Sequence, residues 1–114
     1  MPKEKLTPKT FFEELSEFQT DSFYDVNYTN KFKKSVELCY KRGYNLKFLS
    51  DAIKTLAKQG ILPFSYIPHK LEGYPKNQNI FECHIKPDWL LIWEQNDTEL
   101  ILLLIETGTH SDLF

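Results

Sequence analysis

The chain has 114 residues, of which 41% are hydrophobic and 15% aromatic, and its net charge is −2. This length suits one domain with one compact core, which excludes a disordered chain and a multidomain enzyme. The longest apolar run, residues 100–105, is far shorter than the ~20 residues that cross a membrane. The first residues lack the apolar core of a signal peptide, so we expect a cytoplasmic protein with no membrane partner.

The charge is distributed unevenly along the chain. Residues 1–27 hold three lysines and six acidic residues, a net of −3, whereas residues 28–114 hold eleven basic and ten acidic residues, a net of +1. The second part is nearly neutral and lacks the strongly basic character typical of a nucleic-acid-binding surface. Cys39 and Cys83 have no metal-ligand spacing, and we expect two reduced thiols in preference to one disulfide.

Residues 1–21 are predicted to form an acidic amphipathic helix that extends the main domain. Thr10 is the expected N-cap, apolar residues follow at helical spacing, and glutamates occupy the opposite face. One interpretation is that this helix packs on the neighbouring domain. The other is that it covers a functional surface, such as the basic helix face formed by Lys31, Lys33 and Lys34.

Two further helices are predicted between residues 29 and 60. The first begins after Thr29 or Asn30 and ends before Gly43, and the second covers residues 46–58 and ends at Gly60. The tight turn between them predicts an antiparallel helical hairpin. Arg42, the only arginine, is assigned to the end of the first of these helices, where we expect it to be remote from the site.

The strands surround this hairpin in the sequence. Alternating apolar residues and turn signals predict strands at residues 22–28, 80–86, 88–95 and 99–107. Residues 61–79 are rich in Pro, Asn and Gln and are predicted to form a long loop. The order indicates an α+β domain, with the helical hairpin packed on a small, mainly antiparallel four-stranded sheet.

Three histidines in the second half of the chain are the candidate catalytic groups: His69, His84 and His110. Imidazoles titrate near neutral pH, so together with Asp88 they suit acid–base cleavage of a phosphodiester through a 2′-hydroxyl. No pair has the close spacing of a zinc site, and we expect no metal. On spacing alone, however, a structural role is favoured, with His84 in the core and the other two histidines on the surface.

Three segments favour a catalytic role of the histidines over a structural one: His69–Gly73, Glu82–Ile92 and Thr107–Phe114. They carry the patterns His-x-x-Pro-Asp-Trp and Gly-Thr-His-x-x-Leu-Phe, and they resemble the YafQ-like branch of the RelE superfamily. These proteins are toxins of bacterial type II toxin–antitoxin modules. The resemblance covers residues 22–114 and implies a RelE-like fold, with the helix at 1–21 as an addition.

The resemblance implies a ribosome-dependent endoribonuclease that cleaves mRNA in the ribosomal A site without a metal or other cofactor. The residues that match the acid–base positions of the family are His69, His84, Asp88 and His110. Phe114 matches its terminal aromatic residue, which is suited to stacking on a base. The implied partners are an antitoxin protein and the ribosome with A-site mRNA, while operator DNA is contacted only through the antitoxin complex.

Two positions depart from the pattern of the family. Glu106 stands where an arginine usually holds the scissile phosphate, and Phe81 stands where a second arginine is common. An anion beside the developing phosphorane should cost at least the ~3–4 kcal/mol of one lost electrostatic contact. Lys70, Lys76 and Lys86 are candidates to supply that contact instead, or Glu106 itself is a general base.

Three functions therefore remain open from the sequence. The first is an active toxin-type endoribonuclease. The second is a catalytically weakened homologue that acts by binding the antitoxin or the ribosome, which Glu106, Phe81 and the near-neutral charge favour. The third is an unrelated binding domain or a metal-dependent hydrolase.

Overall fold

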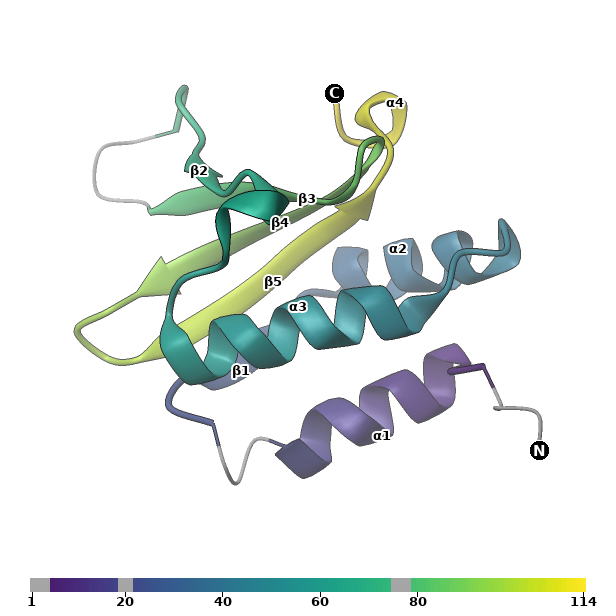
Figure 1. Ribbon diagram of the computed structural model, residues 1–114, viewed down its shortest axis with the longest axis horizontal. Coiled ribbons are helices and arrows are strands. Elements are labelled where there is room, and N and C mark those ends of the chain that lie inside the picture. The colour runs from purple at the N-terminus through teal and green to yellow at the C-terminus, as the bar shows by residue number, and fades with distance from the viewer. Residues whose placement is uncertain (1–4, 19–21, 75–78) are drawn as a thin grey trace.

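The computed structural model of the protein describes residues 5–18, 22–74 and 79–114 (Figure 1). Its helices are α1 (Pro8–Phe18), α2 (Asn30–Lys41), α3 (Leu46–Gln59), a 3-10 helix (Phe64–Tyr66) and α4 (His110–Leu113). Its strands are β1 (Asp25–Tyr28), β2 (His69–Lys70), β3 (Ile80–Lys86), β4 (Trp89–Asn96) and β5 (Ile101–Gly108). Within these described residues, no helix has the length and apolar character needed to cross a membrane.

The strands form one mixed sheet in the order β1-β5-β4-β3-β2. Only β1 and β5 are parallel, while the other three pairs are antiparallel, which confirms the predicted α+β architecture. The sheet has five strands where the sequence predicted four, because the segment predicted as a loop contributes β2 and a 3-10 helix. Strand β2 has two residues, too few to leave an alternating pattern.

Strand β4 starts one residue later than predicted, and two other strand starts differ by two or three residues. The first strand begins at Asp25 because the backbone N–H groups of Phe23 and Tyr24 donate to the carbonyl of Ala57 on α3. The last strand begins at Ile101 because Leu100 adopts a left-handed conformation with φ of 58°.

Capping residues fix the start of α2 and the end of α3. Thr29 caps α2: its hydroxyl oxygen accepts from the N–H of Phe32 and its O–H donates to the carbonyl of Ile105 on β5. Gly60 ends α3 with φ of 74°, and a Cβ there would lie 2.7 Å from the Tyr24 hydroxyl. A larger residue at position 60 is therefore disfavoured by both backbone conformation and space.

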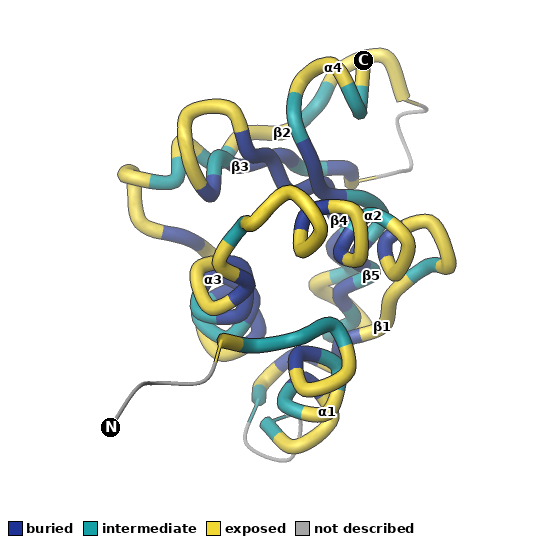
Figure 2. Tube along the Cα trace, turned by 90° about the vertical axis from the view of Figure 1, so that its right-hand side faces the viewer, coloured by how far each residue is buried: buried dark blue, intermediate teal, exposed yellow. Residues whose placement is uncertain are grey.

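The molecule is layered, and Figures 1 and 2 show α1 on the far side of α2 and α3 from the sheet. The core lies between the sheet and the helices and includes Leu91, Trp93 and Leu102 from the strands. Cys39 and Cys83 are buried in it as free thiols, and burial raises their pKa to about 11 and about 12. Both cysteines are thus held as unreactive thiols.

The N-terminal helix α1 is packed into this core. It starts at Pro8, before the predicted cap Thr10, because Thr7 and Thr10 exchange backbone-to-hydroxyl hydrogen bonds of 2.8 and 3.2 Å. Phe11 and Leu15 are almost fully buried. This packing is what we expect if the helix in residues 1–21 packs on the neighbouring domain, the first of the two interpretations.

The acidic face of α1 makes specific contacts with α3 and lies beside α2. Glu14 accepts a hydrogen bond from the Ser50 hydroxyl and pairs with Lys54, which lowers the pKa of its carboxyl. Lys33 belongs to the predicted basic face of α2, and it lines a groove beside α1 together with Glu13. Residues 1–4 and 19–21 of the predicted extension lie outside the described residues.

Candidate active site

The register of the sheet places several of the candidate residues on the face away from the helices. Glu82 on β3 pairs with Ile92 on β4, which pairs with Glu106 on β5. Registered partners on neighbouring strands project from the same face, and residues two apart on one strand share a face. Glu82, Glu106 and His84 therefore share a face, because Cys83 between Glu82 and His84 points into the core.

Three of the predicted residues come together at one end of this face. Asp88 lies in the turn between β3 and β4, and its Oδ1 is 2.7 Å from Nδ1 of His110, the first residue of α4. The backbone N–H of His110 donates to the same oxygen at 3.0 Å. The ring of His84 has its centroid 5.8 Å from that of His110, and its Nδ1 lies 3.2 Å from the Pro87 carbonyl.

The electrostatics of the Asp88–His110 pair favour an ionised carboxylate. Hydrogen bonds from the ring and the backbone of His110 lower the pKa of Asp88. A carboxylate that accepts from Nδ1–H leaves the lone pair of the neutral ring on Nε2. His110 thus presents a proton acceptor to solvent, with its side chain 54% exposed.

His69 lies on the same face but has a different partner. Its Nε2 is 3.1 Å from Oε1 of Glu82, and its Nδ1 is 3.0 Å from the Ile67 carbonyl. Glu82 is buried, with 6% of its surface exposed, so its carboxylate is held against the imidazole. Sequence reasoning placed Glu82 in the motif but gave it no role. Its position two residues before His84 on the same strand could have indicated that the two side chains share a face.

The tail that carries His110 and Phe114 is anchored from α2. Both terminal nitrogens of Arg42 donate to the Asp112 carboxylate, at 2.5 and 3.0 Å, and hold the pKa of that carboxyl well below its usual range. Thr109 and Asp112 also form a capping box at the start of α4. The expectation that Arg42 is remote from the site is therefore wrong. Phe114 is 70% exposed, one helical turn from His110.

Two of the lysines proposed as phosphate contacts, Lys70 and Lys86, lie outside this cluster, and the third, Lys76, is outside the described residues. Lys70 pairs in register with Phe81, so it projects from the face opposite His69. The ammonium of Lys86 lies 3.8 Å from the centroid of the Phe48 ring on α3. Neither side chain projects toward the face shared by the histidines.

Glu106 has a cationic partner of its own. Its Oε1 is 3.2 Å from Nζ of Lys31 on α2, and its side chain is only 14% exposed. Glu106 is therefore ion-paired and largely buried, in contrast to a freely solvated carboxylate at the end of a strand.

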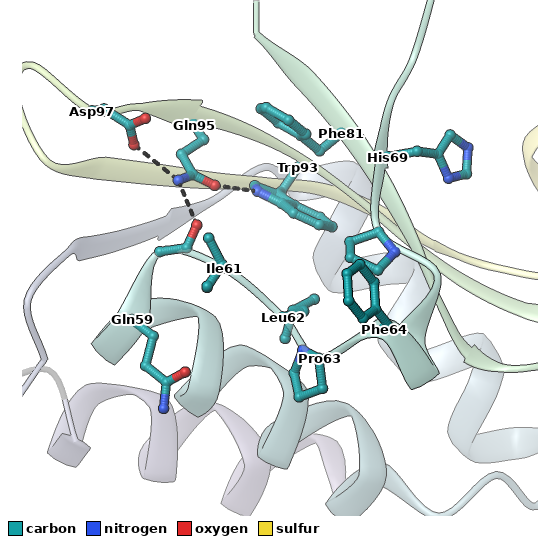
Figure 3. Close-up of a pocket in the computed structure, with 12 residues that line it drawn as sticks. Gln59, Ile61, Leu62, Pro63, Phe64, His69, Phe81, Trp93, Gln95 and Asp97 are labelled. Carbon is teal, nitrogen blue, oxygen red and sulfur yellow. Dashed lines mark hydrogen bonds between the residues drawn. The ribbon is translucent and has the colours of Figure 1, made fainter.

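Phe81 lines a pocket on the side of the sheet that faces the helices, and Figure 3 shows the residues around this pocket. Its ring stacks on Trp93, with centroids 5.6 Å apart and planes inclined by 18°. The pocket has a volume of about 620 Å³ and mostly apolar walls. Gln95 links several of its polar groups: Trp93 donates to Gln95 at 3.0 Å, and the Gln95 amide donates to the Gly60 carbonyl at 2.9 Å. Of the four predicted catalytic residues, only His69 lines it.

Across the part of the chain that the structure describes, no three His, Cys, Asp or Glu side chains are grouped so as to hold a metal ion.

The Arg42–Asp112 pair leads to a local prediction. Substitution Arg42→Ala should speed hydrogen exchange at the backbone amides of residues 112–114, because these amides are protected only within α4 and its cap. The melting temperature should change little, since the pair lies near the surface. Lys47→Ala, which removes a different exposed ion pair with Asp51, is the matched control. Unchanged exchange in Arg42→Ala would mean that α4 is held without the guanidinium.

Comparison with known proteins identifies the family of this chain. The family model described as bacterial toxin of type II toxin-antitoxin system, YafQ, matches residues 24–114. The chain belongs to the YafQ toxin family. The mRNA interferase toxin YafQ of Escherichia coli K12 is 33% identical over 91 residues, which cover 79% of this chain and 95% of the relative.

Solved structures give the same result. The YafQ chain in the crystal structure of the E. coli DinJ–YafQ toxin–antitoxin complex has a TM-score of 0.72 and 33% identity, covering 80% of this chain and 97% of that one. A metal-bound toxin from Helicobacter pylori has a TM-score of 0.73 and 34% identity, covering 81% of this chain and 100% of that one. The archaeal RelE–RelB complex of Pyrococcus horikoshii gives a TM-score of 0.61 at 15% identity, with 75% and 93% covered, a likeness of fold. Helix α1 lies before the YafQ family match.

Proposed function

We propose that this YafQ-family chain is the toxin of a type II toxin–antitoxin module and cleaves ribosome-bound mRNA by metal-independent acid–base catalysis. The observation that carries the proposal is the Asp88–His110 hydrogen bond of 2.7 Å, with a second imidazole, that of His84, 5.8 Å away between ring centroids. The name of the E. coli relative, mRNA interferase toxin, supports the same class of reaction.

The proposed step is attack of an RNA 2′-hydroxyl on the adjacent phosphorus, which breaks the bond to the 5′-oxygen of the next nucleotide. The 2′-oxygen loses its proton, the departing 5′-oxygen gains one, and a cyclic phosphate remains. His110, oriented by Asp88, transfers one of these protons through Nε2, and a second acid–base group on the opposite side of the phosphorus transfers the other. His84 and His69 position the phosphate on the face that they share, and Phe114 stacks on a base.

Glu106 supports a second candidate function, that of a weakened toxin homologue that acts through antitoxin or ribosome binding. Three carboxylates lie on or beside the face where an anionic phosphate would bind: Glu82, Asp88 and Glu106. The single arginine, Arg42, is bonded to Asp112. Lys31 offsets the charge of Glu106 in part, which is why we place the active enzyme first.

The charge at position 106 can be tested directly. Glu106→Arg should raise the single-turnover rate of mRNA cleavage on programmed ribosomes by about tenfold or more, because a cation replaces an anion near the phosphorane. Glu106→Gln should give an intermediate rate. Glu99→Arg, the same reversal in the turn before β5, controls for the change in net charge. A rate that falls in Glu106→Arg would instead assign Glu106 a positive role, such as general base.

The function itself is tested by induced expression of the native chain in bacteria, with growth and mRNA integrity followed together. Growth arrest and cuts confined to translated messages are expected. Normal growth with intact mRNA would exclude the endoribonuclease and leave the binding function.

We also propose an antitoxin as the partner of this chain, with operator DNA contacted only through that complex, in the cytoplasm where the ribosome is found. The E. coli YafQ relative is solved in complex with DinJ. A group of strongly exposed apolar residues supports a protein partner here: Ile61, Phe64 and Ile67. Exposed apolar patches of this kind mark interaction surfaces.

A further inference from the structure

A second pocket lies beneath the turn between β3 and β4, on the helix side of the sheet. It has a volume of about 270 Å³ and is lined by Tyr44, Asn45, Phe48, Lys86, Asp88 and Trp89. This is smaller than the ~300–1,000 Å³ of cavities that enclose drug-sized ligands, so it suits a fragment such as one base.

We propose that this pocket binds one nucleotide of single-stranded RNA beside the scissile phosphate. The Lys86 ammonium, which lies over the Phe48 ring, moves to a phosphate of this nucleotide, and the base stacks on the Tyr44 and Phe48 rings in its place. This inference rests on the proposed endoribonuclease function and adds a recognition subsite to it.

The aromatic wall of the pocket is held rigidly. The ring of Tyr44 packs on Trp89, with centroids 4.9 Å apart. Trp89 is 3% exposed, and its Nε1–H donates to the Thr107 hydroxyl on β5 at 2.9 Å. Phe48, in contrast, is 42% exposed, so part of its ring is open to a ligand. A fixed platform with an open aromatic face is the arrangement on which nucleobases stack.

The mouth of the pocket carries a cation. The Lys86 ammonium lies 3.8 Å from the centroid of the Phe48 ring, and it forms no ion pair with any residue that the structure describes. An ammonium held on an aromatic face, without a carboxylate partner, is available to a phosphate. Aromatic rings and one such cation match the two parts of a nucleotide.

Asp88 connects this pocket to the catalytic cluster. It lines the pocket, and its Oδ1 accepts both hydrogen bonds from His110. An RNA strand with its scissile phosphate at His110 therefore reaches the pocket by passing the β3–β4 turn. The larger pocket at Phe81 shares only His69 with the candidate site and lacks this connection.

The test is a titration of the full chain with a 2′-O-methylated RNA trinucleotide, which carries no 2′-hydroxyl and is not cleaved, followed by NMR chemical shifts. Resonances of Tyr44 and Phe48 should move on binding. Phe48→Ala should weaken binding by about 5- to 150-fold, the range for loss of one stacked base, while Phe48→Tyr should bind like the native chain. Phe23→Ala, which changes an exposed phenylalanine outside both pockets, should have no effect.

The outcomes separate this inference from the proposed function. If the native chain does not bind the trinucleotide, or if Phe48→Ala and Phe23→Ala bind it equally well, the subsite is overturned even where mRNA is cleaved. If Phe48→Ala weakens antitoxin binding and leaves RNA binding unchanged, the occupant is a protein and the inference is again wrong. Selective loss of RNA binding in a chain that does not cleave mRNA would support the subsite and refute the endoribonuclease.

Discussion

Replacing His110 with alanine should lower the rate of mRNA cleavage on programmed ribosomes by about 10²–10⁴-fold, the usual contribution of one acid–base group. The variant loses the proton acceptor that Asp88 orients, while Asp88, the sheet and the helices keep their positions. His110 is the first residue of a four-residue helix and is largely exposed, so the free energy of unfolding should change little.

Two further variants sharpen this result. Asp88→Asn keeps an oxygen that accepts from Nδ1 but removes the charge, so its loss of activity should be smaller than that of His110→Ala. His69→Ala removes the histidine that contacts Glu82 and should weaken substrate binding more than the chemical step. Full activity in His110→Ala would contradict the assignment of this residue, whatever the other two variants show.

The largest expected loss of stability comes from α1. Phe11→Ala should lower the free energy of unfolding by about 3–5 kcal/mol, because the substitution leaves a cavity among fully buried side chains. The Phe11 ring has 0% exposure and lies 5.0 Å from the Phe12 ring and 6.4 Å from the Phe32 ring between centroids. Urea unfolding followed by tryptophan fluorescence measures this difference.

The matched control for this variant is Phe23→Ala, because Phe23 is 64% exposed just before β1. It should cost far less stability. Equal losses in the two variants would mean that α1 does not share the core with α2. The same measurement bears on the role of residues 1–21: a helix that completes the core stabilises the fold, whether or not its acidic face also affects ribosome binding.

The regular elements were predictable because their signals are local. Thr29 at the start of α2 and Gly60 at the end of α3 are capping residues that act within one turn of the chain. Alternating apolar residues predicted β3 with the bounds that the structure shows. The family was also recognisable, because its motifs combine residue types at fixed spacing around His84 and His110.

The parts of the site that sequence reasoning missed depend on contacts between distant residues. The contact of Arg42 with Asp112 joins positions 70 residues apart, and no local pattern indicates it. The direction of Lys86 depends on a register shift between His84 and Lys86, which places this lysine opposite Trp89. Such shifts follow from the packing of a whole sheet and leave no trace in a single strand.

The pairing of β1 with β5 has a consequence for how the protein folds. Asp25 lies beside Ile101 and Tyr28 beside Leu104, so the first strand finds its only neighbour after the rest of the sheet has been synthesised. Helix α2 also depends on β5, because the Thr29 hydroxyl at the start of the helix donates to the Ile105 carbonyl. Contacts between such distant segments raise the contact order and slow folding. A nascent chain that stops before β5 therefore has an unpaired first strand, a helix α2 without its hydrogen bond to β5, and no His110 to complete the histidine cluster.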